Sequence, residues 1–163
     1  MKITVDPFDE KSITKALQQL EQYKKDFLAK EELFVRRLGE IGVSVAGTGF
    51  ATAQYDGTND VVVSMEQSGT RVAVKADGST VGFIEFGAGI NNPPWPGFGV
   101  SYVPPERGTY GDGHGGQKYG WWYNPEDGDK GVHTYGNPPA GAMLEARDTI
   151  IERITQIARE VWR

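Results

Sequence analysis

The side chains best suited to metal binding lie in the second half of the 163-residue chain. His114 and His133 are the two histidines, and neither has a second metal ligand at helical or hairpin spacing. Glu126, Asp127 and Asp129 offer oxygen donors like those of a calcium loop, but the ordered ligand spacing and the closing Glu are missing. A glycine-rich loop that contains polar residues is the better interpretation, and we expect no metal site.

The sequence also contains no pattern typical of a catalytic nucleophile or a phosphate-binding loop. The chain has no cysteine, which excludes disulfides, thiolate zinc sites and cysteine nucleophiles. Ser68, Ser79 and Ser101 do not stand in a nucleophile elbow. The glycine-rich run 111–116 lacks both the lysine pattern and the strand-to-helix context of a phosphate loop. We therefore expect a protein that is not an enzyme, with neither a catalytic residue nor a bound cofactor.

Aromatic side chains are concentrated between residues 95 and 123. The group consists of Trp95, Phe98, Tyr102, Tyr110, Tyr119, Trp121, Trp122 and Tyr123. Aromatics are enriched at protein interfaces, but flat aromatic faces with nearby polar groups also bind sugars. Adjacent Trp121 and Trp122 in a strand face opposite ways, so at most one of them joins a common platform. We favour a contact between subunits made by Trp95, Tyr119, Trp121, Trp122 and Tyr123; the alternative is a carbohydrate-binding module that uses the aromatic loop 95–123.

The charge balance argues against a polyanionic partner. The chain carries 17 basic and 22 acidic residues, a formal net charge of -5, without a long run of either sign. General affinity for nucleic acid needs a concentrated Lys/Arg surface. No apolar run approaches the roughly 18 residues of a membrane span, and no apolar stretch of signal-peptide length follows Met1. We expect a soluble intracellular protein without a membrane partner or a specific nucleic-acid partner.

Apolar residues recur at helical spacing along the first part of the chain. Asp9 or Ser12 is a suitable N-cap. The stripe that follows contains Ile13, Leu17, Leu20, Tyr23, Phe27, Phe34, Leu38, Ile41 and Val45. A helix that runs to about Ala46 is roughly 50 Å long, more than a domain of this size covers by itself. Gly39 and Gly42 are candidate breaks; if the helix is continuous, another chain or a long partner helix must bury part of the stripe.

Between residues 50 and 86 the apolar period changes to two. Four short strands are predicted, at 50–55, 60–66, 70–76 and 80–86, with compact turn sequences between them. Strands with such short links are antiparallel neighbours, because a parallel return needs a long crossover. The predicted sheet is a meander.

Glu85 and Phe86 end the last of these predicted strands. Glu85 alternates with Ile84 and Phe86 and so points away from them. It is either a solvated carboxylate on the outer face, or a salt-bridge partner in a subunit interface or a turn-amide acceptor that holds the loop beginning at Gly87. We include Glu85 and Phe86 in the candidate interface.

No period is sustained between residues 87 and 137, and we interpret residues 90–136 as a long Gly- and aromatic-rich insertion. A second amphipathic helix of about 23 residues begins at Pro138 and Pro139. Its apolar rows are Met143, Ile150, Ile154, Ile157 and Val161, with Leu144, Ile151, Ala158 and Trp162 beside them. We expect a single α+β domain over residues 1–163, in which the C-terminal helix packs with the first helix on the four-stranded meander.

Three short motifs stand at the joints between these elements. Residues 83–89, Phe-Ile-Glu-Phe-Gly-Ala-Gly, end the predicted sheet, and residues 137–143, Asn-Pro-Pro-Ala-Gly-Ala-Met, open the last helix. The first resembles the strand-end motif of the minor tail component, or tail-completion, family of long-tailed double-stranded-DNA phages, with Ala88 in place of the commoner Thr. The second is similar to that family's Pro-Ala turn before a large apolar residue, and residues 55–60 resemble a turn in its relatives. The likeness covers residues 8–89 and 137–162.

This resemblance implies a virion structural protein of the phage head-tail joint, a neck or tail-completion component assembled in the cytoplasm of the host bacterium. Its copies would form a ring that links the portal or adaptor to the tail and contacts other neck or tail proteins, although isolated subunits are often monomers. A ring uses head-to-tail interfaces, so each subunit presents two different surfaces. An acidic chain without a basic cluster also suits a channel that passes DNA without binding it.

Overall fold

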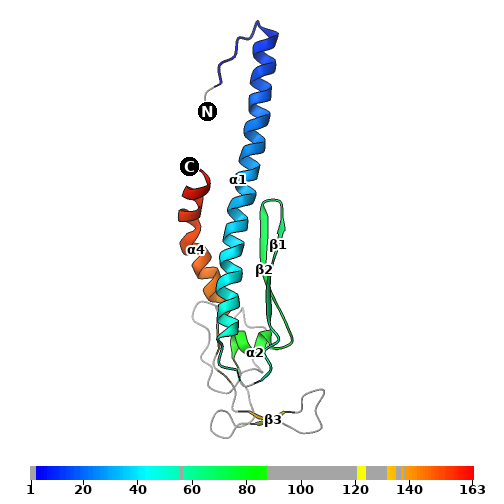
Figure 1. The fold of residues 1–163 in the computed structure, drawn as a ribbon, viewed down its shortest axis with the longest axis vertical. Coiled ribbons are helices and arrows are strands. Elements are labelled where there is room, and N and C mark those ends of the chain that lie inside the picture. Colours follow the sequence, from blue (N-terminus) through cyan, green and yellow to red (C-terminus); the bar gives the residue numbers. More distant parts are fainter. Residues whose placement is uncertain (1–2, 56, 88–120, 124–131, 135–136, 138) are drawn as a thin grey trace, which may run out of the picture.

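The structure is a computed structural model that describes residues 3–55, 57–87, 121–123, 132–134, 137 and 139–163. It is an α+β fold dominated by two helices and a β-hairpin (Figure 1). Its elements, in chain order, are α1 (Glu10–Ala51), β1 (Val62–Ser68), β2 (Arg71–Asp77), α2 (Val81–Phe86), β3 (Trp121–Tyr123), β4 (Val132–Thr134) and α4 (Ala142–Val161).

Helix α1 is one continuous helix of 42 residues. At its start the Asp9 carboxylate accepts a hydrogen bond of 3.0 Å from the Lys11 amide, which confirms the predicted N-cap. The helix passes through Gly39 and Gly42 without a break. Both glycines are buried, and each lies against side chains of the hairpin, so they serve close packing.

The first predicted strand, at 50–55, is wrong because α1 continues to Ala51. Ala46 and Phe50, four residues apart, are both buried in the main core, and helical burial of this pair overrides the alternating pattern that follows. Gly47 and Gly49 follow Ala46, where the helix was predicted to end, but both lie inside α1. Thr52 is the C-cap and its amide donates to the Thr48 carbonyl, while the Ala53 amide donates to the Phe50 carbonyl.

The second and third predicted strands are confirmed as the antiparallel hairpin β1–β2. Ser68 pairs with Arg71 across a two-residue turn, in which Gly69 has the positive φ of 56° that favours glycine. Met65 pairs with Val74, and their side chains turn toward α1, where they lie against Gly39 and Gly42.

The fourth predicted strand, at 80–86, is also wrong, because residues 81–86 form helix α2. The Asp60 carboxylate accepts bonds from the amides of Ser79 and Thr80, at 2.7 and 3.0 Å, and from both of their hydroxyls. These bonds satisfy amides at the start of a helix and so favour a helical turn over a strand. Within residues 57–87 the predicted meander is therefore a two-stranded sheet followed by a helix.

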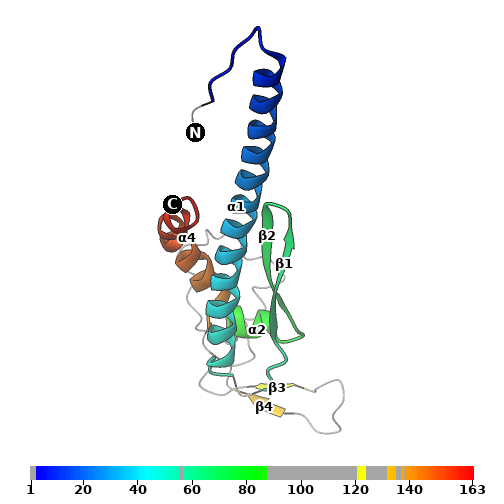
Figure 2. The same cartoon turned by 45° about the horizontal axis from the view of Figure 1, so that its top comes forward.

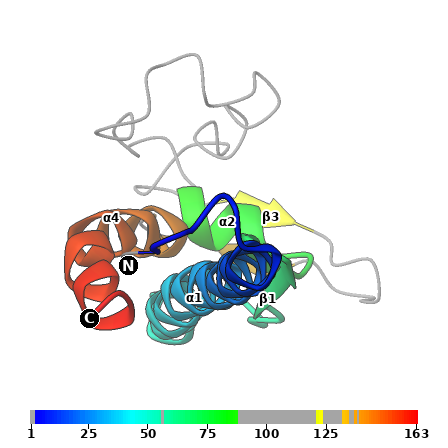
Figure 3. The same ribbon diagram turned by 90° about the horizontal axis from the view of Figure 1, so that it is seen from above.

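Helix α4 runs antiparallel to α1 and packs along it, while the hairpin packs on another side of α1 (Figure 2; Figure 3). The prediction placed both helices on one face of the sheet, whereas α1 lies between α4 and the hairpin. The layers meet at Gly42, where an added Cβ would lie within 3.0 Å of both Val74 and Ile150. α4 has 20 residues and begins after the prolines, at Ala142.

The core has two parts along the contact between α1 and α4. The lower part contains Ala46, Phe50, Ile84, Ala142 and Ala146, which join α1, α2 and the start of α4. The upper part contains Leu38, Ile157 and Val161, with Phe34, Ile41 and Ile150 packed against it. Small residues at the lower end allow the two helices to approach closely there.

The predicted insertion at 90–136 lies mostly outside the described residues. Two short strands within it are described, and β3 pairs antiparallel with β4. Trp121 pairs with Thr134, Trp122 with His133 and Tyr123 with Val132.

The close approach of α1 and α4 yields a matched pair of glycine substitutions. A Cβ added at Gly49 would lie 2.7 Å from the Cβ and 3.0 Å from the Cα of Ala142, whereas one added at Gly47 would meet nothing within 4 Å. We expect Gly49→Ala to lower the free energy of unfolding by about 1–3 kcal/mol, because overpacked backbone must move. Gly47→Ala should raise it by about 0.5–1 kcal/mol, because alanine is the better helix former. Urea denaturation of both variants measures the difference, and equal stabilities would contradict the described packing.

Candidate assembly surface

The N-terminal part of α1 extends well beyond both α4 and the hairpin (Figure 1). Its large apolar side chains Ile13, Leu17, Leu20, Tyr23 and Phe27 are all exposed, and we call them the free stripe. Leu17 keeps 58% and Leu20 keeps 51% of its surface accessible. Isolated exposed apolar residues are ordinary, but a row of this length on one helix is a candidate interaction surface.

The free stripe is the continuation of the buried face of the same helix. Phe34, Leu38 and Ile41 follow it at the same spacing and pack against Ile150 and Ile157 of α4. Because α4 is 20 residues long and α1 is 42, the partner helix ends while the apolar face continues. The geometry thus confirms the expectation that α1 is too long for this domain to cover.

Trp162 marks the end of the covered part. Its ring centroid lies 5.0 Å from that of Phe34, edge-on, and 6.5 Å from that of Phe27, in a tilted arrangement. The Tyr23 ring continues the row, with its centroid 6.4 Å from that of Phe27. Such ring pairs stabilise beyond their buried area. Trp162 itself is 38% exposed, and its neighbour Phe27 is the last residue of the free stripe. The free stripe therefore begins where the contact with α4 ends.

Helix α4 carries a second apolar surface that does not face α1. Leu144, Ile151 and Ala158, seven residues apart, form what we call the outer row. Ile151 is 59% exposed, and the other two are half-buried. The buried residues of α4, such as Ala146 and Ile157, lie on a different side of the helix.

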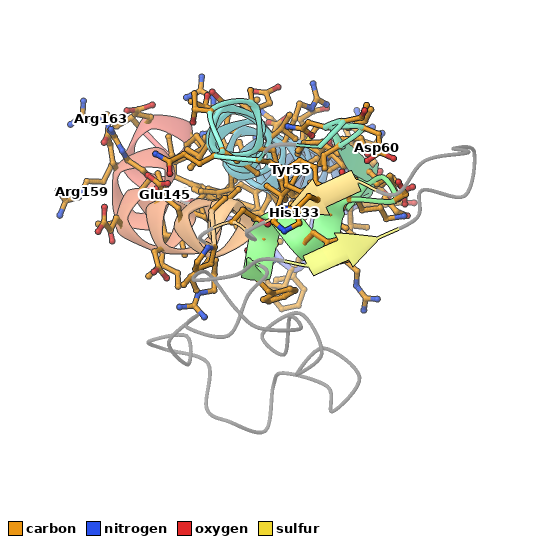
Figure 4. All side chains as sticks on the ribbon, turned by 90° about the horizontal axis from the view of Figure 1, so that it is seen from below. Tyr55, Asp60, His133, Glu145, Arg159 and Arg163 are labelled. Carbon is orange, nitrogen blue, oxygen red and sulfur yellow. The ribbon has the colours of Figure 1, made fainter. Side chains whose placement is uncertain are left out.

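Charged residues of both signs flank the outer row. Glu145, Asp148 and Glu152 line an open depression with Leu144 in the first half of the helix. Exposed Arg147 lies among them and forms an ion pair of 2.8 Å with Asp148. Arg159 and Arg163 lie toward the other end and point away from the fold (Figure 4).

Glu85 fixes the position of this surface. Its carboxylate accepts hydrogen bonds of 3.1–3.2 Å from the Met143 amide and 3.4 Å from the Leu144 amide, at the start of α4. In the same region the amides of Ala140 and Gly141 donate to the carbonyls of Ile84 and Glu85, at 2.8 and 3.2 Å. A carboxylate at a helix N-terminus satisfies orphan amides and complements the helix dipole.

The solvated outer-face interpretation of Glu85 is wrong, since its exposure is only 5%. The amide-acceptor alternative describes its contacts, although the amides belong to α4 and not to the loop after Gly87. Alternation failed here because α2 is a helix, which turns Ile84 and Glu85 inward together. Burial raises the pKa of the Glu85 carboxyl, and the bonds from the Met143 and Leu144 amides oppose that rise.

The other predicted interface residues are only partly located. Phe86 ends α2 and is half-buried. Trp121, Trp122 and Tyr123 form β3, whereas Trp95 and Tyr119 lie outside the described residues.

The residues considered for metal binding divide in the same way. His133 lies in β4 and is half-buried, whereas His114 and the acidic residues at 126–129 lie outside the described residues. Within the part of the chain that the structure describes, there is no group of three or more His, Cys, Asp or Glu side chains placed to hold a metal ion.

Sequence reasoning missed two residues that matter structurally, Asp60 and Trp162. The Ser-Thr pair at 79–80 before an apolar run is a helix-start signal, but the alternating apolar pattern at 80–86 favoured a strand. Trp162 was placed beside the main apolar row of its helix, and no periodicity indicates that it ends a contact with Phe27 and Phe34.

Comparison with known protein families, curated proteins and solved structures finds no match for this chain. Among the described helices, α1 and α4 included, none has an apolar stretch sufficient to cross a membrane.

Removal of the Glu85 carboxylate tests its role in holding α4. Glu85→Ala leaves the buried Met143 and Leu144 amides without this acceptor, and we expect it to cost about 2–3 kcal/mol of unfolding free energy. Glu85→Gln keeps one acceptor oxygen and should lose less unfolding free energy.

Because the pKa of Glu85 is raised in the folded state, its contribution to stability is present below the unfolded pKa and declines as the pH rises through the folded pKa. The stability of wild type relative to Glu85→Gln should therefore fall between pH 4 and neutrality, by roughly 1 kcal/mol per unit of pKa shift; no pH dependence of that difference would contradict this assignment.

Asp60 should produce the opposite pH dependence. The hydroxyls of Thr80 and Ser79, followed by their amides, hold the pKa of the Asp60 carboxyl well below its usual range. Its stabilising effect is present above the unfolded pKa of about 3.9 and disappears as the pH falls through the lower folded value. Melting temperatures measured between pH 2 and 6 should decline more steeply for wild type than for Asp60→Asn. Parallel curves for the two proteins would argue against this cap.

Proposed function

We propose that this protein is a virion structural component of the head-tail joint of a tailed phage, a neck or tail-completion subunit whose copies assemble into a ring. In that role it links the portal or adaptor to the tail and contacts other neck or tail proteins. It performs no catalysis and binds no specific nucleic-acid sequence.

The single observation that supports this proposal most is the free stripe on α1. Full burial of a Leu, Ile or Phe side chain stabilises by roughly 1.5–3 kcal/mol, so a row of five half-exposed residues leaves substantial free energy for association. The stripe stands on a rigid continuous helix and not on a loop. A surface of this kind suits a protein that functions next to others.

A ring requires two different surfaces on each subunit, joined head to tail. The free stripe is one surface, and the outer row of α4 is a second, on another element. The motifs at residues 83–89 and 137–143 add the resemblance to tail-completion proteins. In the structure these two motifs meet, since Glu85 of the first accepts the Met143 amide of the second.

The charge of the chain fits passage of DNA. Its formal net charge of -5 opposes phosphate binding and would keep a DNA channel from retaining its cargo.

Sizing and negative-stain imaging of the purified full-length chain test the proposal. We expect discrete rings, or a defined oligomer that forms as the protein concentration rises or as phage neck proteins are added. A strict monomer under all of these conditions would overturn it. A monomer that binds glycans would instead support the carbohydrate-binding alternative for the loop 95–123.

A pair of lysine substitutions tests whether the free stripe supports assembly. Leu20→Lys places a charge within the stripe and should reduce association about ten-fold or more, because an exposed apolar contact is replaced by a charge that must be desolvated. Gln18→Lys, on another side of the same helix, is the matched control and should assemble normally. Analytical ultracentrifugation measures the association, and circular dichroism checks that both variants keep their helix content. Normal assembly of Leu20→Lys would contradict this role.

A further inference from the structure

We propose that the free stripe of one copy is covered by the outer row of the next copy, with α1 antiparallel to the neighbour's α4. This inference rests on the proposed ring and specifies its subunit contact. The occupant of the stripe is thus a second copy of this chain, through a surface that differs from the stripe itself.

The two rows have the same spacing. Ile13, Leu20 and Phe27 are seven residues apart on α1, as are Leu144, Ile151 and Ala158 on α4. In an antiparallel arrangement one register brings Phe27 opposite Leu144, Leu20 opposite Ile151 and Ile13 opposite Ala158 of the neighbour. A seven-residue repeat on both helices keeps such a contact in register along its length. Each row spans about 21 Å, so neither extends past the other.

The contact within the subunit has the same antiparallel direction, although α4 uses its buried face there and not the outer row. α1 and α4 are antiparallel there too, with Phe34, Leu38 and Ile41 against Ile150 and Ile157. The proposed contact continues the same face of α1 beyond Trp162, where it would meet another α4. A neighbour's helix would therefore extend an apolar seam that already exists.

The charges are only partly complementary in this register. Lys24 is exposed between Leu20 and Phe27 and has no ion pair with any residue that the structure describes. The neighbour's Arg147 comes directly opposite Lys24, with Glu145 and Asp148 close by. Arg147 is paired with Asp148 at 2.8 Å, so Glu145 is the carboxylate best placed to meet Lys24.

At the other end of the contact, Glu10 lies near Arg159 of the neighbour, because the two helices run in opposite directions. This register brings two like-charged pairs near each other, Glu21 with Glu152 and Lys24 with Arg147. All four residues are exposed, which keeps the repulsion weak in water.

The surface available suits a weak contact. Five large residues of the free stripe, each exposed by about 40–60%, together with the outer row offer roughly 700 Å² at most, which is in the range of transient association. An interface of this size also fits subunits that are monomers when dilute and assemble at high local concentration.

The absence of cysteine permits a test by directed cross-linking. The full-length variants Leu20→Cys and Ile151→Cys are prepared separately and mixed, with a short bismaleimide as the probe. We expect covalent dimers only in the mixture. A chain that carries both substitutions should give a ladder of covalent oligomers. Gln18→Cys replaces Leu20→Cys in the matched control and should give at least ten-fold less product with Ile151→Cys.

Each alternative result has its own signature. Dimers of Leu20→Cys alone would show that two stripes pair symmetrically, which overturns the heterologous contact. Rings without cross-links in any mixture would overturn this contact and leave the proposed function standing. A chain that forms neither rings nor cross-links would overturn both.

Charge reversal gives an independent readout. Lys24→Glu should lower the yield of the cross-linked mixture roughly three-fold, the size expected for an exposed ion pair. Glu145→Lys on the Ile151→Cys partner should restore the yield. An unchanged yield in Lys24→Glu, or no rescue by Glu145→Lys, would count against the antiparallel register.

Discussion

The apolar contact between α1 and α4 is the interaction on which the rest of the structure depends. It joins the first and last helices across the whole chain, and both core clusters lie along it. Without it, α1 would keep only the hairpin as a packing partner, and an isolated hairpin is at best marginally stable. The contact ends at Trp162, and α1 continues beyond it. The core contact and the free stripe are therefore two parts of one apolar face.

Polar interactions decide where that contact begins. The Asp60 carboxylate organises the start of α2, and Glu85 at the end of α2 then accepts the first amides of α4. These bonds fix the position of α4 along α1, which in turn sets the length of the face that remains free. A buried carboxylate is expensive unless it is hydrogen-bonded, and the amides of Met143 and Leu144 supply those bonds. A local polar cluster thus controls a surface that lies at the opposite end of the helix.

A free stripe on α1 and an outer row on α4 give one subunit two unlike surfaces on rigid elements. Head-to-tail contacts between unlike surfaces form rings when the rotation closes, whereas like surfaces form two-fold dimers. That distinction links the geometry of a single chain to the proposed role at the phage head-tail joint. In the proposed contact the antiparallel direction also brings Lys24 near Glu145 of the neighbour.

The sequence by itself determined the α+β class, an N-cap at Asp9 or Ser12, the long one-faced helix, the two strands that became β1 and β2, and the unequal lengths of the two helices. These follow from local periodicity and from short turns, which neighbouring residues decide among themselves. Tertiary contacts decided that residues 81–86 form a helix and not a strand, since the bonds that Asp60 accepts from Ser79 and Thr80 cross about 20 residues. They also decided that Glu85 is buried, that α1 is unbroken at its glycines, and that α4 and the hairpin lie on different sides of α1. In each case a partner distant in sequence supplied a hydrogen bond or a packing surface, and periodicity carries no information about such partners.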